Sequence, residues 1–551
     1  MMICGIKASH DGGVALIDGD RLVFSIEVEK LGNGARFSPL GDLNRVEAIL
    51  RSQGVDPDEV DQFVVDGWWA ELGADTAGVS LTRDGAPFRL PVAPYVETGV
   101  SRDPLRRYEF RDVEFGKRTP GYVSYHHASN HLLGSYCTSP FAARGEGALV
   151  LVWDGGMIPR LYRVDADLTV RPVAFLFPIL GSAFSDLACY FGPFSPPESA
   201  GQDQNLSVAG KAMAYAALGT VATDAYVQFD QLVRRRGAAT VESCLALGRH
   251  VRDHRDELFP GLTDADIIAT FQGYLGHRLT TALAGIVRRR FPGQRPNLCI
   301  AGGCALNIKW NSQLRSTGLF ADIWIPPFPN DSGAAIGTAA CEMLHRTGVG
   351  ALRWHVFSGP AVDPAGAEPV GWVSRACDER GVAEILHVEG EPVVVLSGHA
   401  ELGPRALGNR SFLAPAVEPR MKDHLNAVKD RASYRPVAPI CLESHSAEVF
   451  DPGGTDPYML FEHRLRPGWA ERVPAIVHLD GTARLQTITA DSPGAGRILD
   501  EYHRLSGIPL LCNTSANLNG RGFFPDVVSA ARHGRTRYIW SDGRLYTNPT
   551  P

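Results

Sequence analysis

Apolar and polar stretches alternate at the start of the chain in a way that predicts short strands joined by tight turns. Apolar runs at residues 2–10, 14–18 and 21–30 are separated by Asp-Gly-Gly and Gly-Asp, which are hairpin signals between apolar runs. A similar order returns from Ala148 in "ALVLVWDGG", "RLYRVDAD" and "VRPVAFLF". The repeated pattern favours a duplicated α/β architecture, the alternative being two unrelated β meanders.

Helical patterns follow the second set of predicted strands. Residues 205–290 are rich in Ala and Leu and carry charges at helical spacing. A later strand in "RPNLCIAGGCALN" runs into paired glycines, and "FADIWIPPFPNDSGAAIGTAA" joins a strand, a proline-rich loop and a helix of small residues. The segment 357–372 is rich in Pro, Gly and Ala and is the best linker candidate. We therefore expect one domain at 1–356 and a second at 373–551.

Composition narrows the class of protein. A chain of 551 residues is too long for one hydrophobic core. The net charge of -7 weighs against a nucleic-acid partner or an anionic membrane surface. Ten cysteines without a C-x-x-C spacing predict reduced thiols in a cytoplasmic protein. We see no signal peptide, and no apolar run approaches the roughly 20 residues that span a bilayer.

Acidic and glycine-rich positions end several of the predicted strands. Asp154 ends one apolar strand, and "AGGCALN", with Gly302, Gly303 and Asn307, ends another. Asp331 stands at the start of a predicted helix. Glycines at strand ends and helix N-termini suit phosphate groups. Each signal is weak alone, and Asp331 could be an ordinary N-cap.

A histidine pair in "SYHHASNHLL" raises the question of a metal. His127 and His131 are four residues apart, so on a helix they share one face. Such a pair is more often an ordinary polar pair than a metal site. If it binds a metal, Asp154 and Asp331 are the natural carboxylate partners, and two imidazoles with two carboxylates suit Fe(II), Zn or Mn.

Cationic residues cluster between apolar strands in the second half of the chain. They are Arg405, Arg410, Lys429, Arg431, Arg435 and Arg484, followed by Asn513, Thr514 and Ser515 after a last apolar strand. Arginine forks and a lysine suit a small, doubly charged, phosphorylated ligand. The alternative is a solvated face with local ion pairs, but Arg405 and Arg410 lie among Gly, Pro, Ala and Leu.

Eight motifs occur in one order from residue 126 to 517, and together they resemble a known family. They are "HHxxxH", "DGG", "AGGCALN", "NDSGAAIG", "ELGPRALGNRS", "NAVKDRASYRPVAP", "HLDGTARLQT" and "PLLCNTSAN". With "SHDGGVAL" at the start, the chain resembles the O-carbamoyltransferases of antibiotic biosynthesis and the nodulation protein NodU. The resemblance implies that the first domain is a duplicated actin-like (ASKHA, TsaD-like) fold. It implies that the second is a YrdC-like α/β domain that forms carbamoyl adenylate.

The resemblance also implies a reaction. Carbamoyl phosphate is cleaved in the second domain to phosphate and carbamate, and carbamate attacks the α-phosphorus of ATP, used with Mg, to give carbamoyl adenylate and pyrophosphate. In the first domain a hydroxyl of a natural product attacks the adenylate, and AMP leaves. Carbamate is unstable in water, so an enclosed route is expected. The acceptor is expected to be a macrolide, ansamycin or glycoside, and the assembly a homodimer.

Carried over position by position, the resemblance assigns the site residues. The metal ligands are His127, His131, Asp154 and Asp331, with Fe(II) or another divalent metal. The carbamoyl phosphate and adenylate site is Arg405, Lys429, Arg435, Arg484, Asn513 and Ser515, of which Lys429, Arg435 and Arg484 are catalytic. In the first domain the nucleotide is held by Gly302, Gly303, Asn307 and Asp331.

His10, in "SHDGG", stands where the family places a histidine near the acceptor, and we expect it to act as general base with Asp11 beside it. The alternative is a simple turn pair. Ala516 departs from the family, which usually reads "NTSFN" where this chain has "NTSAN". We expect this change to reshape the adenine or carbamoyl pocket.

Three other hypotheses about the function remain. Threonylcarbamoyl modification of tRNA shares both folds but predicts a basic docking face, which the net charge does not favour. An actin-like ATPase or sugar kinase predicts ADP as product, and a non-catalytic scaffold predicts loss of the cationic cluster. Residues 68–118 are rich in aromatic, Gly and Pro residues and fit no core element clearly. We expect this segment to shape the acceptor pocket.

Overall fold

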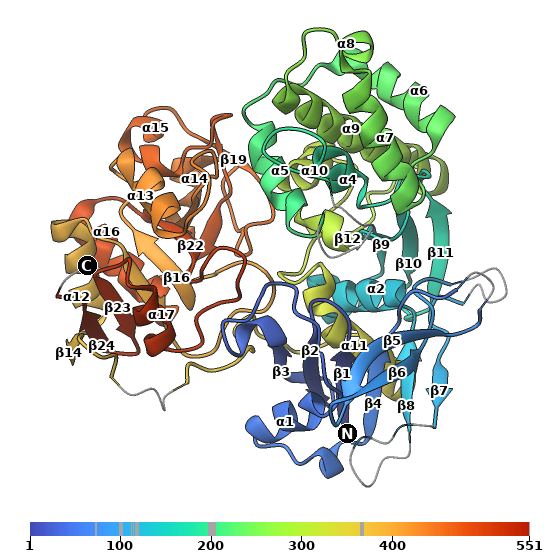
Figure 1. The fold of residues 1–551 in the computed structure, drawn as a ribbon, viewed down its shortest axis with the longest axis horizontal. Coiled ribbons are helices and arrows are strands. Elements are labelled where there is room, and N and C mark those ends of the chain that lie inside the picture. The colour runs from blue at the N-terminus through green and yellow to red at the C-terminus, as the bar shows by residue number, and fades with distance from the viewer. Residues whose placement is uncertain are drawn as a thin grey trace. The chain divides into compact units, whose positions relative to one another are not determined.

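The computed structural model divides the chain into two compact units (Figure 1). It describes residues 1–71, 74–97, 103–111, 113, 115, 121–196, 205–363 and 368–549. The first unit is Met1–Val28 with Phe37–Ser358, and the second is Glu29–Arg36 with Gly359–Pro551. The division between the two larger parts falls at Ser358, inside the segment 357–372 that the sequence marked as a linker.

Two sheets of the first unit share the same connectivity over five strands, and the first sheet has an additional strand, β7, antiparallel to β8. The first sheet has the order β3-β2-β1-β4-β8-β7 and the second the order β11-β10-β9-β12-β13. Each contains an antiparallel three-stranded meander followed by two parallel strands. The duplication expected from the repeated apolar pattern is therefore confirmed. The strands are β1 Met2–Lys7, β2 Gly13–Asp18, β3 Arg21–Glu27, β4 Gln62–Asp66, β7 Tyr108–Phe110, β8 Tyr122–Tyr125, β9 Ala148–Val152, β10 Arg160–Val164, β11 Val170–Phe175, β12 Leu298–Ala301 and β13 Ile323–Trp324.

Helices accompany these two sheets. They are α1 Arg45–Ser52, α2 His127–Cys137, α3 Pro140–Ala143, α4 Ala183–Ala188, α5 Val208–Ala216, α6 Tyr226–Arg236, α7 Val241–Asp253, α8 Arg255–Leu258, α9 Asp264–Arg290, α10 Ile308–Ser316 and α11 Ala334–Thr347. The helices expected in 205–290 are α5 to α9. No helix among the described residues is long and apolar enough to cross a membrane.

Small residues let α2 and α11 pack backbone to backbone. A Cβ on Gly337 of α11 would lie 2.0 Å from the carbonyl oxygen of Asn130 in α2. A Cβ on Gly5 of β1 would lie 2.0 Å from the carbonyl oxygen of Ala335. Every residue of α2 is buried. The run of small residues in "SGAAIGTAA" therefore serves close packing around the helix that carries the histidines.

The segment 68–118 contains a hairpin that the sequence did not reveal. Strands β5 Ala77–Arg83 and β6 Ala86–Val92 pair antiparallel across Asp84 and Gly85, both with positive φ. That Asp-Gly pair is the hairpin signal recognised at the N-terminus, here placed between weakly alternating strands. Residues 72–73, 98–102, 112, 114 and 116–118 of this segment lie outside the described residues.

The second unit is built on one mixed sheet. Its strand order is β14-β24-β23-β15-β16-β22-β17-β21, with a separate small sheet β18-β19-β20. The strands are β14 Val373–Ala376, β15 Val393–Leu396, β16 Arg410–Ala414, β17 Ala438–Leu442, β18 Phe450–Asp451, β19 His463–Leu465, β20 Thr482–Ala483, β21 Gln486–Ile488, β22 Leu510–Ser515, β23 Tyr538–Ser541 and β24 Arg544–Thr547. The helices are α12 Glu379–Glu384, α13 Arg420–Val428, α14 Ser446–Val449, α15 Trp469–Arg472, α16 Ala495–Ser506 and α17 Val527–His533.

A short piece from the N-terminal part of the chain belongs to the second unit. Within Glu29–Arg36, the Lys30 ammonium donates to the carbonyls of Glu401, at 2.5 Å, and Gly403, at 2.8 Å. The backbone of the piece also pairs with residues 520–522. The second unit therefore needs residues that precede its main part by more than three hundred positions.

Candidate functional site

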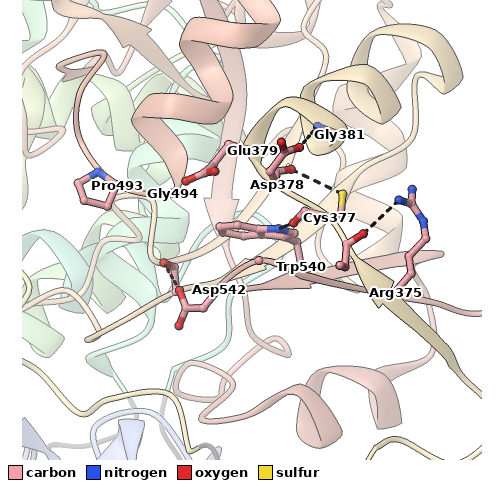
Figure 2. A pocket seen from close by; sticks show the side chains of 12 residues that line it. Arg375, Cys377, Asp378, Glu379, Gly381, Pro493, Gly494, Trp540 and Asp542 are labelled. Atoms are coloured by element: carbon pink, nitrogen blue, oxygen red, sulfur yellow. Dashed lines mark hydrogen bonds between the residues drawn. The ribbon is translucent and has the colours of Figure 1, made fainter.

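A pocket of about 710 Å³ opens in the second unit, but none of the residues named from the sequence lines it. Figure 2 shows Trp540 with its indole N–H donating to the Cys377 carbonyl at 2.8 Å. The lining carries three carboxylates, Asp378, Glu379 and Asp542, and one guanidinium, from Arg375. This excess of acids disfavours phosphate groups.

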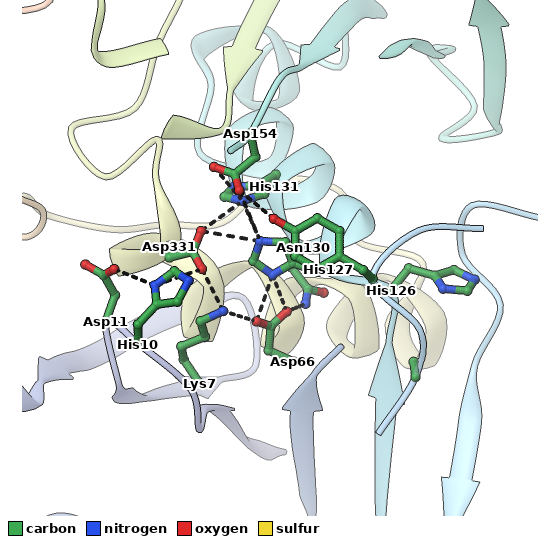
Figure 3. A network of polar contacts seen from close by, with 12 residues as sticks. Lys7, His10, Asp11, Asp66, His126, His127, Asn130, His131, Asp154 and Asp331 are labelled. Atoms are coloured by element: carbon green, nitrogen blue, oxygen red, sulfur yellow. Dashed lines mark hydrogen bonds and ion pairs between the residues drawn. The ribbon is translucent and has the colours of Figure 1, made fainter. Parts of the chain in front are cut away.

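Four residues named as metal ligands meet in the first unit (Figure 3). One ligand atom from each of His127, His131, Asp154 and Asp331 lies within 4.8 Å of the other three, and all four residues are buried. The histidines stand one turn apart on α2, Asp154 follows β9, and Asp331 opens the turn before α11. The duplicated fold thus brings the ends of separate elements to one point.

The distances and donor types suit one divalent cation. The two Nε2 atoms of His127 and His131 are 3.0 Å apart, and Asp331 Oδ1 lies 3.3 and 3.4 Å from them. Asp154 is somewhat farther, with oxygens 3.9 and 3.8 Å from the same nitrogens. Two atoms each about 2.1 Å from one cation lie about 3–3.5 Å apart. The residues therefore fit a cation without rearrangement of the backbone.

The negative charges around His127 also favour a bound cation. Burial lowers the pKa of His127, but Asp66 and Asp331 outweigh burial and raise it to about 10. The carboxylates thus attract a positive charge to this place. A divalent cation supplies that charge and displaces the proton.

His126 does not belong to the cluster, although it precedes His127 in the chain. Its Nδ1 lies 3.1 Å from the Pro94 carbonyl, and its ring points away from the other histidines in Figure 3. Asp331 does not act as an N-cap of α11, which begins without a side-chain cap. Its carboxylate faces the histidines and Lys7 instead.

Three residues of the site were missed by the sequence analysis. Lys7 forms buried ion pairs with Asp66, at 2.8 Å, and Asp331, at 2.7 Å. His127 Nδ1 donates to Asp66, and Tyr95 donates its hydroxyl to Asp154 at 2.6 Å. A signal existed for two of them, because Lys7 and Asp66 are single charges at the ends of apolar strands.

His10 lies beside this cluster. Its Nδ1 is 2.9 Å from Asp11 and 3.6 Å from Asp331. Its ring also contacts Trp68, with centroids 5.4 Å apart. Burial lowers the pKa of His10, but Asp331 and Asp11 raise it above the ordinary value on balance. The residue named as general base is thus held next to a residue named as metal ligand.

The "AGGCALN" turn also meets the cluster. Gly302 has φ of 90°, and a Cβ there would lie 2.4 Å from the Trp153 carbonyl oxygen. The Gly303 amide donates to Asp154 at 2.6 Å, and the Asn307 side chain accepts from the Lys309 amide at 3.2 Å as the cap of α10. In this state these two groups bind the protein itself rather than presenting themselves to a nucleotide.

The cations of the second unit form a separate cluster with little countercharge. Burial and the charges of Arg484, Arg36 and Arg435 lower the pKa of Arg405 well below its usual value. Burial, with Arg435, lowers the pKa of Arg484 to about 10, against the opposing effect of Asp456. Like charges held together away from water indicate a site that is completed by an anion.

Lys429 is the most buried cation of this cluster. It follows α13 and donates to Ser515 Oγ at 2.9 Å, to Asn517 Oδ1 at 2.5 Å and to the Ser515 carbonyl. Burial lowers the pKa of Lys429 well below its usual value, as do Arg431 and Arg435. The structure therefore brings Lys429 and Ser515 into direct contact, while the charges of Arg405, Arg435 and Arg484 act on one another.

Arg410 is not part of the cluster. Its guanidinium donates to the carbonyls of Ser397, Asn409, Pro360 and Gly398, at 2.7 to 3.1 Å. The side chain is 1% exposed and fixes the loops around it. The inclusion of Arg410 among the ligand-binding cations was therefore wrong.

Two arginines and an asparagine keep buried polar atoms without a hydrogen bond to any described residue. These atoms are Nε of Arg405, Nε of Arg484 and Oδ1 of Asn513. Asn513 uses its amide N–H groups on the Ala406 carbonyl, at 3.1 Å, and Gln486 Oε1, at 2.7 Å. Two donors and one acceptor are therefore available, and buried polar groups of this kind require a partner.

Ala516 lies in the hydrophobic core of the second unit and is fully buried. Its amide donates to the Arg410 carbonyl at 2.9 Å. The side chain that departs from the usual aromatic therefore takes part in core packing.

A family model described as "Carbamoyltransferase N-terminus" matches residues 2–341, and one described as "Carbamoyltransferase C-terminus" matches residues 383–538. Nodulation protein U of Rhizobium tropici is 46% identical, covering 99% of this chain and 96% of that protein. The 3'-hydroxymethylcephem-O-carbamoyltransferase of Streptomyces clavuligerus is 33% identical, covering 98% and 97%.

Likeness to solved structures is much weaker. The activator of 2-hydroxyisocaproyl-CoA dehydratase from Clostridium difficile with bound ADPNP is 14% identical, with a TM-score of 0.32, over 62% of this chain and 93% of that one. The family models and the full-length relatives, by contrast, cover both units. The resemblance indicated by the motifs is thus confirmed, and the chain belongs to the carbamoyltransferase family of enzymes.

Proposed function

We propose that this enzyme transfers the carbamoyl group of carbamoyl phosphate, through carbamoyl adenylate formed with ATP, to a hydroxyl of a natural product. The observation that carries the proposal is the set of unpartnered atoms in the second unit. Unpaired Nε donors of Arg405 and Arg484 suit phosphate oxygens, and the unpaired acceptor Asn513 Oδ1 suits an N–H group. Carbamoyl phosphate offers both, whereas inorganic phosphate offers no N–H donor of this kind.

The first steps take place at this cationic cluster. The arginines and Lys429 stabilise charge on the phosphate as the bond between it and the carbamoyl carbon breaks and water is added, which gives phosphate and carbamate. A carbamate oxygen then attacks the α-phosphorus of ATP, and pyrophosphate leaves. Lys429, which is fixed by Ser515 and Asn517, is positioned to neutralise charge on these oxygens.

The second half of the reaction belongs to the first unit. An acceptor hydroxyl attacks the carbonyl of carbamoyl adenylate, and AMP leaves with the electrons of the broken bond. His10 is the proposed base: Asp11 engages its Nδ1, so its other ring nitrogen takes the hydroxyl proton. A divalent metal bound by His127, His131, Asp154 and Asp331 would supply positive charge for an adenylate phosphate oxygen.

The acceptor is proposed to lie against an aromatic wall of the first unit. The rings of Trp69 and Tyr95 stack with centroids 4.4 Å apart, and Tyr95 reaches Asp154. Trp69 is 36% exposed, so a ring remains available next to the candidate metal ligands. The name of the cephem relative specifies a hydroxymethyl acceptor. That relative supports a hydroxylated acceptor, and the stacked rings support one with a ring system, such as a glycoside or macrolide.

The first test uses purified protein with ATP and carbamoyl phosphate but no acceptor. We expect pyrophosphate and AMP to form only when both substrates are present, and the products to disappear in Lys429→Ala. Lys422→Ala is the matched control, because Lys422 lies on α13 and forms no hydrogen bond or ion pair with the described residues of the cluster. ADP as the product would instead indicate an ATPase or kinase, and equal pyrophosphate without carbamoyl phosphate would contradict the proposal.

A further inference from the structure

Lys7 and Asp66, which no sequence motif identified, contact the candidate metal ligands Asp331 and His127 through atoms that do not face the other ligands. We propose that Asp66 and Lys7 are positioning residues, which hold His127 and Asp331 in the geometry that binds a divalent cation. The inference rests on the metal site of the proposed function. Lys7 and Asp66 end the neighbouring parallel strands β1 and β4, and their side chains are 1% and 2% exposed.

Asp66 selects the proton position on His127. Its two oxygens lie 2.8 and 3.0 Å from His127 Nδ1, and Asn130 also donates to it. A carboxylate at Nδ1 keeps the proton on that nitrogen, which leaves the Nε2 lone pair free. Nε2 is the atom that faces His131 and Asp331, so Asp66 presents His127 as a ligand.

Lys7 selects the oxygen with which Asp331 faces the cluster. Its ammonium lies 2.7 Å from Asp331 Oδ2, whereas Oδ1 is 3.3 Å from His127 Nε2. The same ammonium lies 2.8 Å from Asp66, so one lysine contacts both Asp331 and the carboxylate that holds His127 (Figure 3). Asp331 is thereby directed to bind through one oxygen.

The pair also leaves the net charge of the ligand set unchanged. Lys7 and Asp66 cancel, so two imidazoles and two carboxylates remain to match a divalent cation. Removal of either member leaves a buried charge without its partner, which destabilises any protein. Loss of stability alone therefore does not distinguish a positioning role from an ordinary buried ion pair.

The first unit contains a matched ordinary pair. Arg107 lies 2.9 Å from Glu342, whose side chain is fully buried, and the ion pair includes none of the four ligands. Arg107→Met removes one cationic partner of the buried Glu342 in the same unit, and it serves as the control for stability without an effect on metal binding.

The experiment titrates metal-free protein with Co²⁺ and follows the visible absorption, with a competing chelator to fix the affinity. Asp66→Leu and Lys7→Met are expected to weaken Co²⁺ binding about 10–100-fold and to change the spectrum. Arg107→Met is expected to lower the melting temperature but keep the affinity within about twofold of the parent.

Asp66→Asn, which is near-isosteric, and Lys7→Gln, which keeps a polar side chain, serve if the larger changes prevent folding. Asn keeps an oxygen for Nδ1–H, so we expect a smaller loss from it than from Leu. Folded Asp66 and Lys7 variants with the parent affinity and spectrum would overturn the inference while leaving the metal site intact. A parent without Co²⁺ binding, or an unchanged affinity in Asp154→Ala, would overturn the metal site itself and the inference with it.

Discussion

In the proposed function, the side-chain oxygen of Asn513 distinguishes a phosphorylated ligand that has an N–H group from one that does not. Its amide orientation is set by the Ala406 carbonyl and by Gln486, which itself donates to the Leu407 carbonyl at 2.7 Å. The remaining oxygen therefore presents an acceptor. Arginines alone would bind many phosphates, but an acceptor among cations selects a ligand with an N–H group.

Asn513→Leu is expected to reduce discrimination between carbamoyl phosphate and acetyl phosphate. Leu keeps the approximate volume of the side chain but offers no acceptor, and loss of one well-made hydrogen bond to the ligand costs about 1–2 kcal/mol, or roughly 5–30-fold. The measurement is the ratio of binding constants for the two compounds, since general disturbance of the site cancels in a ratio. An unchanged ratio would contradict the role given to Oδ1.

Asp186 is a buried acid outside the proposed chemistry, and it makes stability depend on pH. Burial raises its pKa to about 6, from an ordinary value near 3.8. The folded state therefore binds more protons than the unfolded state between these pH values, so stability falls as pH rises through about 4 to 6 and stays lower above.

Asp186→Asn removes this dependence. We expect a gain of about 1–3 kcal/mol at pH 7.5 and no gain at pH 4, read from denaturant unfolding at both pH values. Asp253→Asn, at an exposed position on α7, is the control and should show no such difference. A gain that is equal at both pH values would rule out titration as its cause.

Among the helices and strands, the contact of α2 with α11 determines where the histidines stand. Gly134 and Gly337 face each other, with a Cβ on Gly134 only 3.2 Å from the Gly337 Cα. Helices that approach this closely leave no room for a methyl group. The ligands on α2 and the turn that carries Asp331 are therefore placed by one tightly packed interface.

Gly337→Ala is expected to destabilise the protein by about 1–3 kcal/mol or more, because the added methyl group meets backbone. Gly210→Ala in α5 is the matched control, since nothing lies within 4 Å of its Cβ position. That control should be neutral or gain up to about 1 kcal/mol from helix propensity. The measurement is the thermal unfolding of both variants. An equal change in stability for the two would contradict the packing argument.

For the chain as a whole, the placement of Glu29–Arg36 makes the second unit discontinuous. Gly522 shows how closely the piece is packed, because a Cβ there would lie 1.8 Å from the Glu29 carbonyl oxygen. Arg36 also contributes to the charges that lower the pKa values of Arg405 and Lys429. The anion cluster thus depends on a residue that is distant from it in sequence.

A fragment of residues 359–551 is therefore expected to be less stable than the second unit within the full chain. A peptide of residues 27–38 should bind the fragment and raise its melting temperature by about 2–5 °C when saturating. The same peptide with Lys30→Ala should bind more weakly, because it lacks the donor to Glu401 and Gly403. A fragment that melts identically with and without the peptide would contradict this account.

Much of the architecture was readable in the chain because its cause is local. Strand patterns with Asp-Gly turns recur from Met2 and from Ala148, and both places form the meanders that the patterns predicted. The four-residue spacing predicts that His127 and His131 share one face of a helix, and both lie on α2 in the same cluster. Asp154 and Asp331 were predicted beside the histidines from their places at a strand end and a helix start, and the structure brings all four residues to the same point.

Contacts that depend on distant parts of the chain were decided only by the tertiary structure. Arg410 and Arg405 look alike in "GPRALGNRS", yet only packing shows that carbonyl groups surround Arg410. Lys7 and Asp66 are single charges at strand ends, and they form an ion pair only because β1 lies beside β4. The sequence of Glu29–Arg36 gives no indication that this piece belongs to the second unit. Local pattern depends on neighbours in sequence, whereas burial and charge pairing depend on which elements meet in space.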